Sequence, residues 1–287
     1  MGRKNIPPAM FWLVILLAFF LFSSLWGFYI SIRPPKIVST ISPKDLGLDY
    51  QEVSFASEDN ITLRGWFIPA RGTTTAKTII ALHGYPADKG NILPAMAFLA
   101  QNFNLFLFDF RYLGESSGSY STAGAQETKD LLGAIAFLKS RGIREVGVWG
   151  FSMGGAVALM GAPKAAEIKA IVSESSYARL DLMAPALFRI PVVRYPLGWL
   201  TSLWARLFLA IDLKSVSPKD AANHLKIPVL IIHSKSDPVI SFDHALMLQE
   251  SLKNNPRAEF WLRENLLHGE LGSEYQNRIG GFFEKHL

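Results

Sequence analysis

Residues 145–162 pass from an apolar strand pattern into a helix pattern through a run of small residues. Residues 145–149 (EVGVW) predict a strand and residues 156–162 a helix, with Gly150-Phe151-Ser152-Met153-Gly154 between them. A Gly-x-Ser-x-Gly turn at such a junction lifts the serine hydroxyl above the edge of a sheet, and the helix start behind it offers backbone N–H donors. The pattern indicates a layered fold in which strands lead into helices, and it makes Ser152 the candidate nucleophile.

The chain beyond residue 50 repeats this alternation. Strands are predicted at residues 50–55, 61–68, 77–82, 104–109, 145–149, 168–173, 228–233 and 259–263. The first two form a hairpin, and helical stretches separate most of the others. Such alternation predicts the α/β class, with a mostly parallel sheet between helices on both faces. Functional groups in these folds collect in loops at the carboxyl ends of the strands.

An apolar stretch stands near the start of the chain. Between Lys4 and Arg33 there is no charged residue, and residues 9–30 are almost wholly apolar. As a helix they would extend about 33 Å, close to the roughly 30 Å hydrocarbon core of a bilayer. Aromatic residues lie near both ends, as in the aromatic belts of membrane proteins. A signal peptide has a shorter apolar region and a small-residue cleavage site, and the sequence holds no convincing site of that kind.

We therefore divide the chain into four parts. We expect a basic N-terminal segment at residues 1–8, a transmembrane anchor at residues 9–32, a linker at residues 33–49 and a folded domain at residues 50–287. A cleaved signal peptide and a buried core helix are the alternatives for the anchor. Basic residues flank both of its ends, and we favour a single-pass arrangement with the folded domain outside the cytoplasm.

A long insert interrupts the alternation. Residues 177–225 separate two predicted strands by roughly fifty residues, far more than an ordinary connection. The insert is rich in bulky apolar and aromatic residues, and its charges are mostly basic. It forms either extra core helices or a helical lid over the active site that touches lipid.

A serine nucleophile needs a base, and the base needs an orienting acid. His268 lies in a loop after the last predicted strand, and Asp237 follows the strand before it. Pro238 holds the turn that presents this carboxylate. The order serine, acid, histidine along the chain favours Asp237 with His268. Glu174, which follows the strand at 168–173, is the rival acid.

Two backbone N–H groups are expected to bind the oxyanion. One belongs to Met153, directly after the nucleophile, and the other to Tyr85, in the tight turn after the strand at residues 77–82. His83 is expected to brace that turn. Ser116 lies in a second Gly-x-Ser-x-Gly pattern, but no strand precedes it and no apolar helix follows it, so we interpret it as a loop residue.

These motifs carry a family resemblance. The residues concerned are His83-Gly84, Asp109-x-Arg111-x-x-Gly114-Glu115-Ser116-x-Gly118, Ser152, Asp237 and His268. Together they resemble the α/β-hydrolase fold superfamily over about residues 50–287, and the single N-terminal anchor is similar to the Bem46-type membrane-associated serine hydrolases. The resemblance implies an eight-stranded sheet with a helical lid insert, and it makes Asp109 and Arg111 bracing residues of a loop.

Composition narrows the function further. The chain has 287 residues and a net charge of +5. It contains no cysteine, and this excludes thiol nucleophiles and thiolate metal sites. The sequence contains no nucleotide-binding glycine loop, no cluster with metal-ligand spacing and no nucleic-acid motif, so we expect no cofactor, no metal and no nucleic-acid partner. The expected activity is cleavage of acyl esters or thioesters, with an apolar or lipid-like substrate at a membrane. The alternatives are an acyltransferase on the same scaffold and a non-catalytic, membrane-tethered binding protein.

Overall fold

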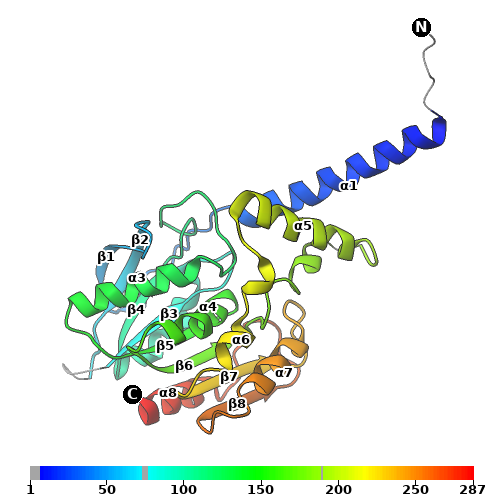
Figure 1. Cartoon of the computed structure of the whole chain (residues 1–287). Helices are drawn as coiled ribbons and strands as arrows, with labels where there is room; N and C mark the ends of the chain where they lie inside the picture. The colour runs from blue at the N-terminus through cyan, green and yellow to red at the C-terminus, as the bar shows by residue number, and fades with distance from the viewer. Residues whose placement is uncertain (1–6, 73–76, 189) are drawn as a thin grey trace.

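A single twisted sheet organises the protein. The computed structural model describes residues 7–72, 77–188 and 190–287, and Figure 1 shows their arrangement. The strands are β1 (Gln51–Ala56), β2 (Thr62–Ile68), β3 (Thr78–Leu82), β4 (Asn104–Phe108), β5 (Val146–Phe151), β6 (Ile168–Glu174), β7 (Val229–Ser234) and β8 (Ala258–Arg263). Their order is β1-β2-β4-β3-β5-β6-β7-β8. Strand β2 is antiparallel to β1 and β4, and all other neighbours are parallel. The predicted mostly parallel, eight-stranded sheet is confirmed.

Helices cover both faces of this sheet. The described residues form the helices α1 (Pro8–Ile32), α2 (Lys89–Met96), α3 (Glu127–Ser140), α4 (Met153–Gly161), α5 (Arg194–Leu209), α6 (Pro218–Ala222), α7 (Phe242–Ser251) and α8 (Tyr275–His286). One apolar cluster joins the sheet to α3, α4, α6 and α7, and a second joins its other face to α2 and α8. The two main core clusters therefore lie on opposite sides of the sheet, and a smaller one joins α4 to the insert.

The central strands are rich in apolar residues because both of their faces are covered. All five residues of β3 are buried, as expected for a parallel strand between two helical layers. At the edge of the sheet, β1 buries only Phe55, which is paired in register with Leu63 of β2. Successive parallel strands end at one edge of the sheet, and the loops that follow them meet there.

Helix α1 projects away from the sheet, and its domain-proximal half lies beside α5 (Figure 1). Ser24, Gly27 and Phe28 are its buried residues. Only 6% of its most apolar 18-residue window is buried, and by length and composition the helix could cross a membrane. The alternative of a buried core helix is therefore wrong, while a signal sequence has the same character. The expected basic segment at residues 1–8 lies outside the described residues except for Pro7 and Pro8.

The segment between α1 and β1 is bound to the domain along its length. The backbone N–H of Ser121 donates to the carbonyl of Ile32 (2.8 Å). The Tyr112 hydroxyl donates to the carbonyl of Pro34 (3.0 Å). Farther along, the backbone N–H of Ser39 donates to a carboxylate oxygen of Asp88 (2.6 Å), and a 3₁₀ helix, η1 (Pro43–Leu46), precedes β1. These contacts fix the end of α1 relative to the sheet.

Candidate active site

Ser152 occupies a strained turn between β5 and α4. Its φ is 54° and its ψ is −116°, a backbone conformation that residues with a Cβ atom rarely adopt. The backbone N–H of Ser152 donates to the carbonyl of Glu174 (2.8 Å), which holds the turn against β6. A Cβ atom on Gly150 would lie 2.3 Å from the carbonyl oxygen of Gly154, and one on Gly154 would lie 2.4 Å from that of Leu82. Glycine is needed at both positions because backbone atoms occupy the space that a side chain would fill.

Asp237 and His268 meet at the same edge of the sheet. Asp237 follows β7 and His268 follows β8, and the imidazole Nδ1 lies 2.7 Å from the Oδ2 atom of Asp237. The other carboxylate oxygen accepts the backbone N–H groups of Val239 (2.8 Å) and Ile240 (2.9 Å). Burial opposes the ionisation of this carboxyl, yet the hydrogen bonds from His268 and from the two backbone N–H groups hold the pKa of Asp237 below its usual range. The contact with an ionised Asp237 is suited to holding the imidazole in one orientation.

Within the described chain, the candidate base is hydrogen-bonded to the candidate acid but not to the candidate nucleophile. Among the described residues, the hydroxyl of Ser152 makes no hydrogen bond to His268. The imidazole instead lies against the ring of Phe151, the residue before Ser152, with ring centroids 4.7 Å apart. Hydrogen bonds of this kind are often long in a free enzyme and tighten when substrate binds.

Glu174, the rival acid, has other partners. Its side chain is fully buried, and it accepts hydrogen bonds from the hydroxyl of Tyr275 (2.5 Å) and from Nη2 of Arg263 (3.1 Å). Burial raises the pKa of this carboxyl against the opposing effect of both partners. The carboxylate that contacts His268 is that of Asp237, and Glu174 contributes its backbone carbonyl to the turn at Ser152.

The turn after β3 lies against the nucleophile. A Cβ atom on Gly84 would be 3.2 Å from that of Ser152. Nε2 of His83 accepts the backbone N–H of Phe110 (3.0 Å), so the proton stands on Nδ1, which donates to the carbonyl of Gly84 (2.7 Å). Burial lowers the pKa of His83 and keeps the ring neutral. His83 therefore braces the turn that carries Tyr85.

The remaining motif residues support neighbouring loops through buried polar contacts. The Ser116 hydroxyl is buried and donates to the backbone carbonyl of Asp109 (2.6 Å). The side chain of Asp109 pairs with Lys89 (2.7 Å), and Arg111 pairs with Asp130 (2.7 Å). These contacts are those expected of bracing residues. In the described part of the chain, no group of His, Asp and Glu side chains could hold a metal ion.

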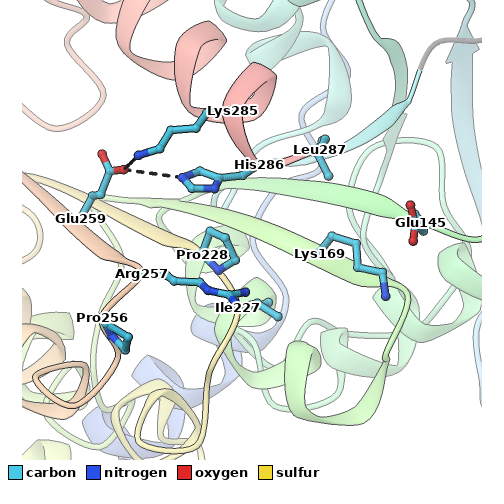
Figure 2. A pocket seen from close by; sticks show the side chains of 10 residues that line it. All are labelled: Glu145, Lys169, Ile227, Pro228, Pro256, Arg257, Glu259, Lys285, His286 and Leu287. Atoms are coloured by element: carbon cyan, nitrogen blue, oxygen red, sulfur yellow. Dashed lines mark hydrogen bonds and ion pairs between the residues drawn. The ribbon is translucent and has the colours of Figure 1, made fainter.

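Two cavities are comparable in size but differ in chemistry. One of about 560 Å³ is lined by Ser152, Met153 and Tyr85 together with mostly apolar side chains of the insert and of α1. The other, of about 620 Å³, lies around the C-terminal end of α8 and is lined by charged side chains such as Lys285 and Glu259 (Figure 2). Because the first cavity contains Ser152, the candidate nucleophile, it is the candidate substrate site.

Comparison with known proteins shows to which family this chain belongs. A family described as alpha/beta hydrolase fold matches residues 77–200. The protein YfhR of Escherichia coli is 31% identical over 244 residues, which are 83% of this chain and 78% of YfhR. The chain belongs to the α/β-hydrolase family. This hydrolase is also 24% identical over 260 residues to the protein bem46 of Schizosaccharomyces pombe, covering 85% of the chain and 80% of bem46. The structure of the Pyrococcus furiosus esterase Pf2001 aligns with a TM-score of 0.75 at 28% identity, over 89% of this chain and 99% of the esterase.

Three residues of the cavity wall were not predicted from the sequence. Phe28, Ser31 and Ile32 of α1 line the Ser152 cavity. The sequence carried a signal for such packing, because Ser24, Gly27 and Ser31 interrupt the apolar run at helical spacing. Small and polar residues on one face of a membrane helix indicate a protein contact.

Proposed function

We propose that this α/β hydrolase is a serine hydrolase that cleaves acyl ester or thioester bonds. Ser152 is the nucleophile, His268 the general base and Asp237 the residue that orients it, with the N–H groups of Tyr85 and Met153 as oxyanion donors. The observation that carries the proposal is the 2.7 Å contact between Asp237 and His268 beside the strained turn of Ser152.

The proposed reaction has two halves. The oxygen of Ser152 bonds to the substrate carbonyl carbon while its proton passes to His268. The tetrahedral intermediate then expels the alcohol or thiol, which takes that proton. Water attacks the acyl-enzyme and gives a proton to His268. The bond to Ser152 then breaks, His268 returns the proton to the serine oxygen, and the carboxylic acid leaves. The two backbone N–H groups stabilise the negative oxygen in both halves, and each such donor is worth about 2.7–4 kcal/mol.

The cavity favours an apolar acyl group. Most of its lining side chains are apolar, among them Leu180, Met183 and Leu209, and each buried methylene of an acyl chain contributes about 0.8 kcal/mol. The similarity to an esterase agrees with this choice. We propose that the insert at residues 177–225 is a lid, because its residues cover the cavity in which Ser152 lies.

We further propose that α1 is a membrane anchor and not a cleaved signal sequence. Cleavage after the apolar helix would remove three side chains from the cavity wall. In this proposal residues 9–32 cross the membrane once, residues 33–49 connect the anchor, and the hydrolase domain at residues 50–287 lies outside the cytoplasm.

Fluorophosphonate labelling tests the nucleophile directly. The Ser152 oxygen bonds to phosphorus and fluoride leaves, so labelling requires an activated serine. Wild type and Ser116→Ala are expected to be labelled in membranes, and Ser152→Ala is expected to show no label. Labelling that survives in a folded Ser152→Ala variant would contradict the assignment.

Product analysis separates hydrolysis from the alternatives. With a p-nitrophenyl ester in the presence of a competing alcohol, a hydrolase releases the free acid, whereas an acyltransferase forms the new ester. A folded wild type that takes neither label nor substrate, even in detergent that opens the lid, would indicate a binding protein.

A further inference from the structure

The membrane-side end of the substrate cavity is built from the apolar N-terminal helix. Ser152 lies on the wall contributed by β5 and α4, while Phe28, Ser31 and Ile32 from the last turns of α1 line the same space. At about 560 Å³, the cavity falls within the range of small-molecule sites. Side chains from α1 and from the catalytic turn therefore share one chamber.

Contacts on either side hold this end of α1 in place. The hydroxyl of Tyr85 donates to the backbone carbonyl of Ser31 (2.6 Å), so the residue with the proposed oxyanion N–H is bound directly to α1. On the other side, the rings of Phe28 and Phe208 of α5 stack with centroids 6.2 Å apart. A Cβ atom on Gly27 would lie 2.7 Å from the ring of Phe188, so the insert packs closely on the helix backbone. These contacts make α1 an integral part of the cavity.

The outer surfaces of α1 and α5 suit lipid. On α5, Tyr195, Trp199 and Leu207 are exposed and recur every fourth or eighth residue, which places them on one face. Most apolar side chains of α1 are exposed as well. Because α5 lies beside the domain-proximal half of α1 (Figure 1), the exposed side chains of the two helices lie near one another. Exposed apolar surface continuous with a proposed membrane span is expected to contact the bilayer.

We propose that α1 is a substrate-binding element, and that the cavity takes the acyl chain of a membrane lipid directly from the bilayer, between α1 and α5. Phe28 and Ile32 then contact the chain and select for its length. This inference rests on the proposed function, because the acyl carbon must reach Ser152. In this proposal α1 contributes to the choice of substrate as well as to the location of the enzyme in the membrane.

The test compares two isoleucines of the same helix turn. Ile32 lines the cavity, whereas Ile30 is 48% exposed. Full-length Ile32→Trp and Ile30→Trp proteins are reconstituted in phosphatidylcholine vesicles, and the rates at which hexadecyl and methyl fluorophosphonates label Ser152 are measured. Displacing about two methylene groups from an apolar cavity corresponds to about tenfold in affinity. Ile32→Trp is expected to lower the ratio of long-chain to short-chain labelling about tenfold, and Ile30→Trp to leave it unchanged.

The short-chain probe separates the two proposals. If the wild type reacts with neither probe in vesicles or in detergent, the proposed function fails and this inference fails with it. Reaction in detergent alone overturns entry from the bilayer. If the wild type reacts with the methyl probe, and Ile32→Trp changes both rates equally or neither rate, the nucleophile stands and the role of α1 is overturned. A wild type that reacts more slowly with the hexadecyl probe in vesicles than with the methyl probe also overturns entry from the bilayer.

Discussion

The indole nitrogen of Trp204 donates a hydrogen bond of 3.0 Å to the hydroxyl of Ser24. This contact joins α5 of the insert to α1, two helices that are far apart in the sequence. The Ser24 hydroxyl in turn donates to the carbonyl of Leu21 within its own helix (2.9 Å). The bond is therefore part of a short chain that continues into the backbone of the apolar helix.

Trp204→Phe is expected to weaken this junction while keeping most of the ring. A hydrogen bond of this type contributes about 0.5–1.5 kcal/mol, which corresponds to a fall in Tm of about 1–6 °C for a chain of this size. Thermal unfolding in detergent measures the shift. Trp199→Phe is the matched control, because Trp199 is 67% exposed on the same helix. An equal shift in both variants would contradict a specific role for the bond.

Substitution of Asp237 is expected to lower the rate of catalysis, whereas substitution of Glu174 is expected to lower stability. Asp237→Asn keeps the shape of the side chain but removes the charge that orients His268, and the loss in kcat is expected to be on the order of 10⁴. Glu174→Gln leaves Arg263 buried beside a neutral partner, so stability is expected to fall by about 3–5 kcal/mol. Turnover of p-nitrophenyl acetate and thermal unfolding are measured for both. Full turnover in Asp237→Asn would overturn its assignment as the orienting acid.

Acid is expected to remove the stabilising contribution of Asp237. Its pKa in the folded protein lies below the ordinary value of 3.8 because hydrogen bonds from His268 and two backbone N–H groups outweigh burial. A lowered pKa means that the contribution is complete above the unfolded value and is lost as the pH falls through the folded value. The difference in Tm between wild type and Asp237→Asn should therefore be constant at neutral pH and shrink below about pH 4. A difference that grows on acidification would contradict this contact.

Two glycine substitutions are expected to change stability in opposite directions. In Gly150→Ala the new methyl group would meet the backbone of α4 at 2.3 Å, and overpacking of this kind costs about 1–3 kcal/mol. Gly281 lies in α8 with nothing near the position of a Cβ atom, and Gly281→Ala is expected to stabilise the helix by up to about 1 kcal/mol. Denaturant unfolding measures both changes. A neutral Gly150→Ala would mean that the turn at Ser152 can shift without cost.

Strand patterns were the most predictable part of the fold. The run at residues 77–82 is short, apolar and rich in branched side chains, and the structure places β3 at Thr78–Leu82. A parallel strand that is covered on both faces is rich in apolar residues whatever fold it belongs to, so its pattern can be recognised locally. The order of serine, acid and histidine could be predicted in the same way, because it depends only on each residue following a strand. Their proximity depends on the pairing of β7 with β8 and on the position of β5, which follow from the sheet order.

The insert was less predictable because its structure depends on distant contacts. Residues 177–225 have an apolar composition but no single period, and the structure shows one long helix, α5, with shorter helical turns around it. The position of α5 is set by packing against α1, including the stack of Phe28 on Phe208. Local patterns do not identify such a partner, so the contribution of Phe28 to the cavity wall could not be derived from them.

The bound segment between α1 and β1 has a consequence for how this hydrolase would meet its substrates. A free tether would let the domain rotate and sample the aqueous phase, but here Pro34 and Ser39 are held by Tyr112 and Asp88. With α1 in a bilayer, the mouth of the cavity would keep one orientation toward its own leaflet. Encounters would then be two-dimensional, governed by the surface density of a lipid and its lateral diffusion. Substrate choice would follow membrane composition as closely as it follows the shape of the site.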